Sequence, residues 1–326
     1  MSGISGGTRG QAVGLRIIAT GRAIPSRRVD NEELSRYVDT SDQWIKSRSG
    51  IHSRYFCGDG EDTASLAIRA AALALKRSGI QPEEIGLCLV ATFTPSSATP
   101  STACLVQGAL GLAEDIPSFD LNAACSGFLY ALETARALLA AGSLSRPYAL
   151  VIASEEISRV LDFSDRSTCV LFGDGAAALV AAAEPGRLYH CLLGSRGAPD
   201  ILHCPGLGRE GQSVRMRGAE VFRFAAETAP ECVRQALEAA GLDMENVDYF
   251  VCHQANKRII DHVIKKLGGP PEKFYRNLER YGNTSAASIP IALDEMAEKG
   301  LLSPGKRLIL VAFGAGLTWG ATLLEW

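Results

Sequence analysis

The sequence predicts an α/β fold built from two related halves, with mixed sheets sandwiched by helices. Apolar stretches of strand length alternate with amphipathic helical stretches along the chain. A pattern in the first half also returns in the second. The 326 residues, of which 47% are hydrophobic and 21% charged, suit two domains or one large two-part unit.

The first half contains the predicted elements in alternating order. The expected strands are Val13–Gly21, Ile85–Thr92, Ile116–Leu121, Tyr148–Ser154, a strand starting at Cys169, and Ala176–Ala182. The expected helices are Asn31–Tyr37, Thr63–Ser78, Pro100–Leu110 and Gly127–Ala141. Gly79 is expected to end the Thr63 helix as its C-cap. The stretch from Gly186 to Arg215 is rich in Gly and Pro and is expected to be an irregular loop.

The repeat rests on two independent matches. Ala74-Leu75, Gly79-Ile80 and Ile85 return as Ala236-Leu237, Gly241-Leu242 and Val247, 162 positions later. Asn122 and the helix after Cys125 correspond to Asn283 and a helix Ser288–Glu298, 161 positions later. Two matches at nearly one offset indicate a duplicated α/β unit. Each half is expected to end in a strand, a glycine-rich turn and a strand, Cys169–Ala182 and Arg307–Trp326. The expected domains are 13–183 and 184–326.

Composition and charge exclude several classes of protein. The net charge of −3 and the absence of a long basic run give no indication of nucleic-acid binding. No apolar run is long enough to span a membrane and the N-terminus lacks a signal-peptide core, so we expect a cytoplasmic protein. Residues 1–12 are small and polar, and are expected to be disordered. The nine cysteines contain no C-x-x-C pair, which favours free thiols over disulfides or zinc.

Cys125 is the first candidate for chemistry. It lies where the Ile116–Leu121 strand gives way to the Gly127 helix. Free backbone N–H groups and the helix dipole favour a negative charge there. We therefore expect a lowered thiol pKa and a nucleophilic role. The alternative is a small buried apolar residue, which is the usual role of a free cysteine.

His253 and Asn283 are the next candidates. Both follow predicted strands that the repeat relates to strands near Cys125, so all three side chains are expected at the same ends of the sheets. A thiolate nucleophile with His and Asn hydrogen-bond donors suits acyl transfer through a thioester. A cysteine protease uses the same residue types. Taken singly, His253 also fits a strand-end histidine and Asn283 a turn residue.

Three motifs with this order and spacing resemble one family closely. They are LNAACSGF around Cys125, CHQANKRI around His253 and GNTSAASIP around Asn283. Together they resemble β-ketoacyl-acyl carrier protein synthase III, a thiolase-fold condensing enzyme with αβαβα layers. The resemblance covers Val13 to Trp326.

The resemblance implies a two-step acyl transfer. An acyl-CoA acylates Cys125; malonyl-acyl carrier protein then loses CO2, and the carbanion, stabilised by His253 and Asn283, attacks the acyl group. No metal or redox cofactor is required. The implied oxyanion hole consists of the backbone N–H groups of Cys125 and Ala315.

The resemblance also implies the binding positions. The expected CoA and pantetheine contacts are Thr40, Trp44, Arg48, Arg159, Gly218, Phe222 and Asn256, with Arg159 on the side facing Trp44 and Arg48. Phe313 and Thr99 are expected at the acyl pocket, where the small Thr99 would admit longer primers than acetyl.

The expected partners are acyl carrier protein, acyl-CoA and a second copy of the chain in a homodimer, with no nucleic acid and no membrane. The basic residues expected to dock the acidic carrier protein are Arg223, Arg258, Lys265 and Lys266. Read from the residues alone, the last three could equally form a solvated helix face. The implied function is the priming condensation of type II fatty acid synthesis. The alternative is a starter-unit condensing enzyme or acyltransferase of a polyketide or other secondary pathway.

Overall fold

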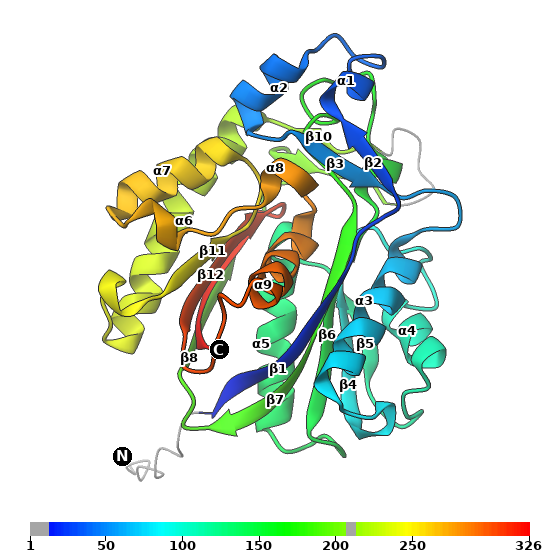
Figure 1. Cartoon of the computed structure of the whole chain (residues 1–326), viewed down its shortest axis with the longest axis vertical. Helices are drawn as coiled ribbons and strands as arrows, with labels where there is room; N and C mark the ends of the chain where they lie inside the picture. The colour runs from blue at the N-terminus through cyan, green and yellow to red at the C-terminus, as the bar shows by residue number, and fades with distance from the viewer. Residues whose placement is uncertain (1–12, 207–212) are drawn as a thin grey trace, which may run out of the picture.

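The computed structural model describes residues 13–206 and 213–326, and the segment predicted to be disordered, residues 1–12, lies outside this range. Two mixed sheets face each other across a central pair of helices (Figure 1). The first sheet contains β1 (Val13–Ala23), β7 (Gly175–Pro185), β6 (Tyr148–Glu155), β4 (Ile85–Ala91) and β5 (Ser118–Leu121). The second contains β8 (Tyr189–Ser195), β13 (Thr318–Glu325), β12 (Arg307–Gly314) and β11 (Tyr249–Cys252).

The two sheets have the same connectivity. In the first, β4 runs parallel to β6, which pairs antiparallel with β7, which pairs antiparallel with β1. In the second, β11, β12, β13 and β8 repeat this order and these directions. The predicted duplication is therefore present in the fold, whereas the domain boundary at residue 183 stays a prediction.

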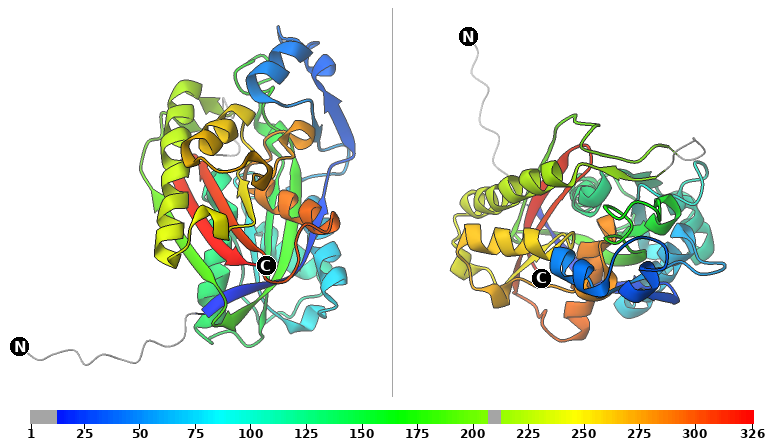
Figure 2. Two further views of the ribbon diagram at one scale, coloured as in Figure 1. Left: turned by 60° about the vertical axis from the view of Figure 1, so that its left-hand side comes forward. Right: turned by 90° about the horizontal axis from the view of Figure 1, so that it is seen from above.

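The helices form the remaining three layers, which alternate with the two sheets across the view of Figure 1 and are seen from two further sides in Figure 2. The central layer is formed by α5 (Gly127–Ala140) and α9 (Ser288–Glu298), preceded by the 3-10 helices η2 (Ala124–Ser126) and η6 (Ser285–Ala287). The outer face of the first sheet is covered by α3 (Thr63–Ser78) and α4 (Thr102–Leu110), and that of the second by α6 (Gly218–Ala240) and α7 (Lys257–Leu267). These layers give the αβαβα arrangement.

Alternation along the strands divides the core. On β4, Leu87 and Leu89 face the central helices, whereas Cys88 and Val90 face α3 and α4. Both faces of the strand are apolar because helices cover both faces of the sheet. In α9, every residue from Ser288 to Met296 is buried, and the two acidic residues in this stretch, Asp294 and Glu295, are paired with arginine or lysine side chains.

Smaller elements complete the chain. A cap above the sheets contains β2 (Arg27–Asp30), α1 (Asn31–Leu34), α2 (Asp42–Ser49) and β3 (Ser53–Phe56). The other short elements are η1 (Pro82–Glu84), η3 (Ile157–Val160), β9 (Leu202–His203), β10 (Arg215–Met216), η4 (Met244–Asn246), η5 (Pro271–Lys273) and α8 (Leu278–Tyr281). The helix predicted over Asn31–Tyr37 is thus shorter, with Asp30 as its N-cap.

Two predictions of secondary structure are wrong. No strand begins at Cys169: this apolar stretch is a buried turn, in which the N–H of Cys169 donates to Asp165 O. The stretch from Gly186 to Arg215 is not wholly irregular, because Tyr189–Ser195 is strand β8, and two further short strands, β9 and β10, pair with each other. The true counterpart of the β12–β13 hairpin is therefore the β6–β7 pair.

Candidate active site

Cys125 lies in a tight turn between β5 and α5. Its neighbour Ala124 has a φ of 46°, a left-handed conformation that is unusual for a residue with a side chain. The side-chain oxygen of Asn122 accepts a hydrogen bond from the N–H of Ala124 at 3.1 Å. The end of β12 closes over the turn at Gly314, where a Cβ atom would lie 2.8 Å from the nitrogen of Cys125. The second sheet can approach the cysteine this closely only because Gly314 has no side chain.

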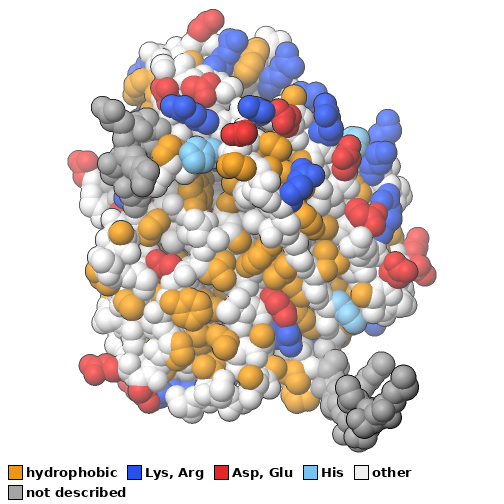
Figure 3. All heavy atoms as spheres, turned by 180° about the vertical axis from the view of Figure 1, so that it is seen from behind, with side chains coloured by type: hydrophobic (Ala, Val, Ile, Leu, Met, Phe, Trp, Pro, Cys, Tyr) orange, Lys and Arg blue, Asp and Glu red, His pale blue; other side chains and the backbone are white. Residues whose placement is uncertain are grey.

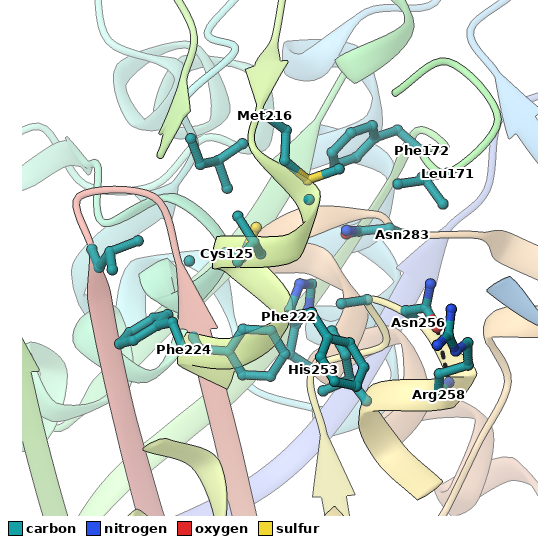
Figure 4. A pocket seen from close by; sticks show the side chains of 18 of the residues that line it. Cys125, Leu171, Phe172, Met216, Phe222, Phe224, His253, Asn256, Arg258 and Asn283 are labelled. Atoms are coloured by element: carbon teal, nitrogen blue, oxygen red, sulfur yellow. Dashed lines mark hydrogen bonds between the residues drawn. The ribbon is translucent and has the colours of Figure 1, made fainter. Parts of the chain in front are cut away.

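Asn283 lies in the equivalent turn of the second half. Its Oδ1 accepts a hydrogen bond from the N–H of Ser285 at 2.9 Å, and Ser285 has a φ of 49°. Because the N–H of Ser285 needs an acceptor, the amide oxygen of Asn283 faces Ser285 and the amide nitrogen faces the opposite side (Figure 4). The backbone of Asn283 is held by the buried turn described above, through bonds to Leu171 O and from Gly173 N. The stretch mistaken for a strand therefore positions the asparagine.

His253 follows β11 and is 1% exposed. Burial lowers its pKa to about 3, so the ring is neutral near pH 7. Its Nδ1 lies 2.7 Å from the hydroxyl oxygen of Ser288, which also accepts a hydrogen bond from the N–H of Gln254 at 3.3 Å. The ring of Phe313 packs edge-on against the imidazole, with centroids 5.4 Å apart.

The pKa of Cys125 is raised, whereas the sequence-based expectation was a lowered pKa. Burial raises the pKa of this thiol to about 12, and the charge of Glu155 adds to the rise, whereas a hydrogen bond from Ser285 lowers it. The hydroxyl of Ser285 donates to Sγ at 3.4 Å. Loss of hydration outweighs the favourable place at a helix start, so the resting side chain is a neutral thiol.

The three side chains meet in one cavity of about 450 Å³, into which they project from separate segments (Figure 4). Its wall also includes three predicted binding residues, Gly218, Phe222 and Asn256, as well as Arg258 and Phe313. A second cavity of about 210 Å³ also reaches Cys125; its lining includes Phe93, Val160, Leu202, Cys204 and Ala315. Cys125 therefore borders two cavities.

Ala315 follows Gly314 at the end of β12 and shares the smaller cavity with Cys125. Within the described residues, Ala124 and Ser285 are the non-glycine residues with positive φ, so Ala315 is unstrained. The conformation that requires glycine belongs to Gly316, with a φ of 133°. Alanine at position 315 can therefore present its N–H as glycine would.

Of the residues expected at the CoA entrance, Trp44 and Arg48 contact each other, whereas Arg159 has other partners. Trp44 and Arg48 lie on α2, and the guanidinium of Arg48 is 5.9 Å from the indole centroid. The arginine that covers the indole most closely is Arg166, at 4.7 Å, which the sequence reasoning missed. Arg159, expected on that side, instead donates hydrogen bonds to the carbonyl oxygens of Thr94 and Pro95. Arg159 lies in the short helix η3, and no pattern in the sequence distinguished the two arginines.

Thr40 precedes α2 and is half-buried, with no hydrogen-bond partner for its hydroxyl among the described residues. Thr99 is exposed and lines neither of the two cavities at Cys125 in the single chain. Its expected place at the acyl pocket depends on a second copy of the chain and stays a prediction.

The expected basic residues are exposed on two neighbouring helices. Arg223 lies on α6, and Arg258, Lys265 and Lys266 lie on α7. Among the described residues none of the four forms an ion pair with a carboxylate, whereas the adjacent Lys257 is paired with Asp261. Arg258 also packs over Phe222 at 5.7 Å, at the edge of the larger cavity. These four charges are therefore available to an acidic partner.

Metal-binding clusters and membrane-spanning helices are both absent from the described part of the chain. Across residues 13–206 and 213–326, no group of three His, Cys, Asp or Glu side chains is arranged to hold a metal ion. No helix in the same ranges has the length and apolar character needed to cross a membrane.

Comparison with known proteins agrees with this geometry. Residues 119–197 match the family described as 3-oxoacyl-[acyl-carrier-protein (ACP)] synthase III, and residues 237–326 match its C-terminal part. The β-ketoacyl-[acyl-carrier-protein] synthase III of Clostridium acetobutylicum is 46% identical, over 96% of this chain and 98% of the relative. That of Rhizorhabdus wittichii is 45% identical, over 95% and 98%.

Solved structures show the same likeness. The crystal structure of 3-oxoacyl-[acyl-carrier-protein] synthase III from Aquifex aeolicus superposes with a TM-score of 0.91 at 42% identity, covering 96% of this chain and all of that one. The priming β-ketosynthase of the R1128 polyketide pathway superposes with a TM-score of 0.90 at 34% identity, over 95% of this chain and 96% of that one.

The duplicated αβαβα layers and the buried cysteine turn define a thiolase-fold condensing enzyme. Within that class, the chain belongs to the β-ketoacyl-acyl carrier protein synthase III family, whose members are acyltransferases of fatty acid biosynthesis.

Proposed function

We propose that the chain condenses an acyl-CoA primer with malonyl-acyl carrier protein, with Cys125, His253 and Asn283 as the catalytic residues. The observation that carries the proposal is their convergence in one cavity, in a chain of this family. Attack by the sulfur of Cys125 on the thioester carbonyl forms the acyl-enzyme and expels CoA. The N–H groups of Cys125 and Ala315 donate to the oxyanion that develops.

The second step uses His253 and Asn283 as hydrogen-bond donors. The malonyl group loses CO2, and the negative charge that develops on its thioester oxygen is stabilised by the amide N–H of Asn283 and by Nε2–H of His253. The carbanion attacks the acyl-enzyme and releases a β-ketoacyl product. Since the pKa of His253 is lowered to about 3, the ring acts as a neutral donor and not as a proton acceptor. Ser288 donates to Nδ1, which keeps the ring proton on Nε2.

The binding residues follow from the same proposal. The pantetheine arm lies in the larger cavity beside Gly218, Phe222 and Asn256, and the acyl chain enters beside Phe313. The adenine end lies near Trp44 and Arg48, with Thr40 close by. Arg166 takes the facing position expected of Arg159, because it is the arginine that stacks on the indole.

The partners are an acidic carrier protein and a second copy of the chain. Arg223, Arg258, Lys265 and Lys266 form the docking surface for the carrier protein, supported by their exposed charges on α6 and α7 and by the place of Arg258 at the larger cavity. A homodimer is supported by β5, an edge strand whose Phe119 is 38% exposed. The face turned away in Figure 1 also exposes apolar side chains over a broad area (Figure 3). A cytoplasmic location stays a prediction.

A mixture of acyl-CoA thioesters of graded length tests the proposal. We expect one acyl group per chain on Cys125, mapped by peptide mass spectrometry, and no label on Cys125→Ala. Label on another residue in both proteins would contradict it. If short primers react best, the chain primes fatty acid synthesis. A preference for long or unusual primers would favour the starter-unit alternative, which the likeness to the R1128 ketosynthase keeps open.

A further inference from the structure

Glu155 is a buried carboxyl group to which no role in the condensation has been assigned. It ends β6, is fully buried, and lies where the repeat places the counterpart of Gly314, the last residue of β12. Gly314 closes against the turn of Cys125, and Glu155 correspondingly lies against the turn of Ser285 in the other half. The carboxyl group of Glu155 thus lies beside the active site at the position where the other half has Gly314, which has no side chain.

The two oxygens of Glu155 have different surroundings. Oε2 accepts hydrogen bonds from the Thr92 hydroxyl at 3.1 Å, from the Phe93 and Thr94 N–H groups at 3.2 Å, and from the Thr94 hydroxyl at 2.6 Å. Oε1 has no hydrogen-bond partner in the described part of the chain. Glu155 therefore holds the loop after β4 through Oε2 alone. A buried oxygen without a hydrogen-bond partner costs stability, which suggests that Oε1 has another use.

Ser285 connects Glu155 to the nucleophile. Its hydroxyl lies 3.4 Å from the sulfur of Cys125, and it is close enough to Glu155 to lower the pKa of that carboxyl. The charge of Glu155 in turn raises the pKa of the Cys125 thiol. Ser285 is therefore hydrogen-bonded to the thiol and lies near the carboxyl group, because η6 packs against the strand that Glu155 ends.

We propose that Glu155 receives the proton of the Cys125 thiol through the hydroxyl of Ser285. During acylation the Ser285 hydroxyl turns from Sγ, to which it donates in the resting site, towards Glu155. The S–H proton then passes to Ser285 Oγ as the Ser285 proton passes to Glu155 Oε1. The sulfur bonds to the acyl carbon, and the CoA thiolate that leaves takes a proton from water. When condensation expels Cys125 as a thiolate, the same path returns the proton from Glu155, so the enzyme ends unchanged.

The alternative proton acceptor at the site is unsuitable. His253 cannot hold the proton near pH 7, because burial lowers its pKa to about 3. The pKa of Glu155 is raised by burial to about 7, which matches the operating pH of a general base. The charge of Glu155 raises the pKa of two thiols, Cys125 and Cys204, and both thiols are neutral near pH 7.

The test is the rate of acylation of Cys125 by acyl-CoA as a function of pH, and it rests on the proposed function. In the wild type the rate should rise through a pH of about 7, as Glu155 ionises. Glu155→Gln should abolish that rise and lower the rate above it by about 10²-fold, the lower range of general-base effects. Ser285→Ala should do the same, and the double variant should be no worse than either single one.

Two variants make the test decisive, one that should fold normally and one that serves as the matched control. Ser285→Ala leaves the bonds to Oε2 in place, and Ala124 already adopts the same left-handed conformation in the equivalent turn, so the protein should fold. Asp174→Asn removes another buried carboxyl, one that is bonded to Ser158 and Cys57, and should keep the wild-type pH profile. An unchanged profile in Glu155→Gln, or additive losses in the double variant, would overturn the inference. Absence of any acyl group on wild-type Cys125 would instead overturn the proposed function.

Discussion

The turn at Cys125 and the turn at Ser285 are two copies of one backbone design with different side chains. In each, an asparagine side chain binds the N–H two residues later, a residue with positive φ follows, and a central helix begins. The first copy carries Cys125, the proposed nucleophile, where the second has Ala286. The second copy buries its asparagine, whereas Asn122 is exposed. Duplication thus supplied one backbone frame, and the proposed chemistry is divided between its two copies.

The largest effect on activity is expected when the thiol is moved from the turn at Cys125 to the turn at Ser285. Cys125→Ala should lose acylation completely, and adding Ala286→Cys to it should not restore labelling. The reason is that position 286 is 1% exposed and lines neither cavity that reaches Cys125. The measurement is the mass of the protein after incubation with acyl-CoA. An acyl adduct at position 286 in the double variant would show that the two turns are interchangeable.

Gly314→Ala tests the close contact at the first turn. A Cβ atom there would lie 2.8 Å from the nitrogen and 3.0 Å from the Cβ of Cys125, so the turn must shift. Displacing an oxyanion donor typically lowers the rate by roughly 10²–10³-fold, and we expect a loss of that size in single-turnover acylation. Gly197→Ala, where nothing lies within 4 Å, is the matched control. Equal rates in the two variants would contradict the role given to Gly314.

The two asparagines should differ sharply when truncated. Asn283→Ala removes the donor proposed for the enolate and should lower the rate of malonyl decarboxylation by about 10²-fold. Asn122→Ala removes one exposed turn hydrogen bond and should cost about 1 kcal/mol of stability with little loss of rate. Chemical denaturation and CO2 release measure the two effects. Similar losses of activity in both variants would remove the functional difference between the turns.

Ser288→Ala should produce a smaller loss. Without the serine hydroxyl, the ring proton of His253 is free to move to Nδ1, which points away from the cavity. Loss of one hydrogen bond worth about 1.4 kcal/mol would lower condensation about tenfold. Acylation of Cys125 should be unaffected, and Ser288→Thr should restore part of the activity. A loss confined to acylation would place Ser288 elsewhere in the mechanism.

The buried His253 should also affect stability at low pH. Its pKa falls from 6.5 to about 3 on folding, so the unfolded chain binds the proton more tightly. The contribution of the neutral ring to stability is complete above pH 6.5 and is lost as the pH falls towards 3. Denaturation of wild type and His253→Gln at several pH values should give a shallower dependence for the variant over this range. Parallel curves would contradict the assigned shift.

The sequence was sufficient to predict the duplicated fold and the order of its main elements. The bounds of α3 match the prediction because its caps and apolar face are local signals. The bounds of α9 also match, and there the repeat supplied the signal. The turn at Cys169 was mistaken for a strand, because a short apolar stretch has the same sequence pattern whether it forms a buried turn or a buried strand. Strand β8 was missed because its partner, β13, lies far away in sequence.

At the site, motif and spacing were sufficient to select Cys125, His253 and Asn283 as candidates, which the structure brings together in one cavity. The electrostatics could not be predicted in the same way. The raised pKa of Cys125 depends on burial by both halves, and the lone oxygen of Glu155 depends on packing between β6 and η6. The pairing of Trp44 with Arg166 likewise joins segments more than a hundred residues apart.

The most direct test of the account is a single turnover of the acyl-enzyme. Acyl-Cys125 would be prepared with acyl-CoA, freed of excess CoA thioester, and mixed with malonyl-acyl carrier protein, with masses followed in time. The account predicts that Cys125 loses its acyl group as CO2 and a β-ketoacyl carrier protein appear in equal amounts, and that Asn283→Ala slows this step but not acylation. Acyl-Cys125 that persists, or is hydrolysed without a β-ketoacyl product, would contradict it.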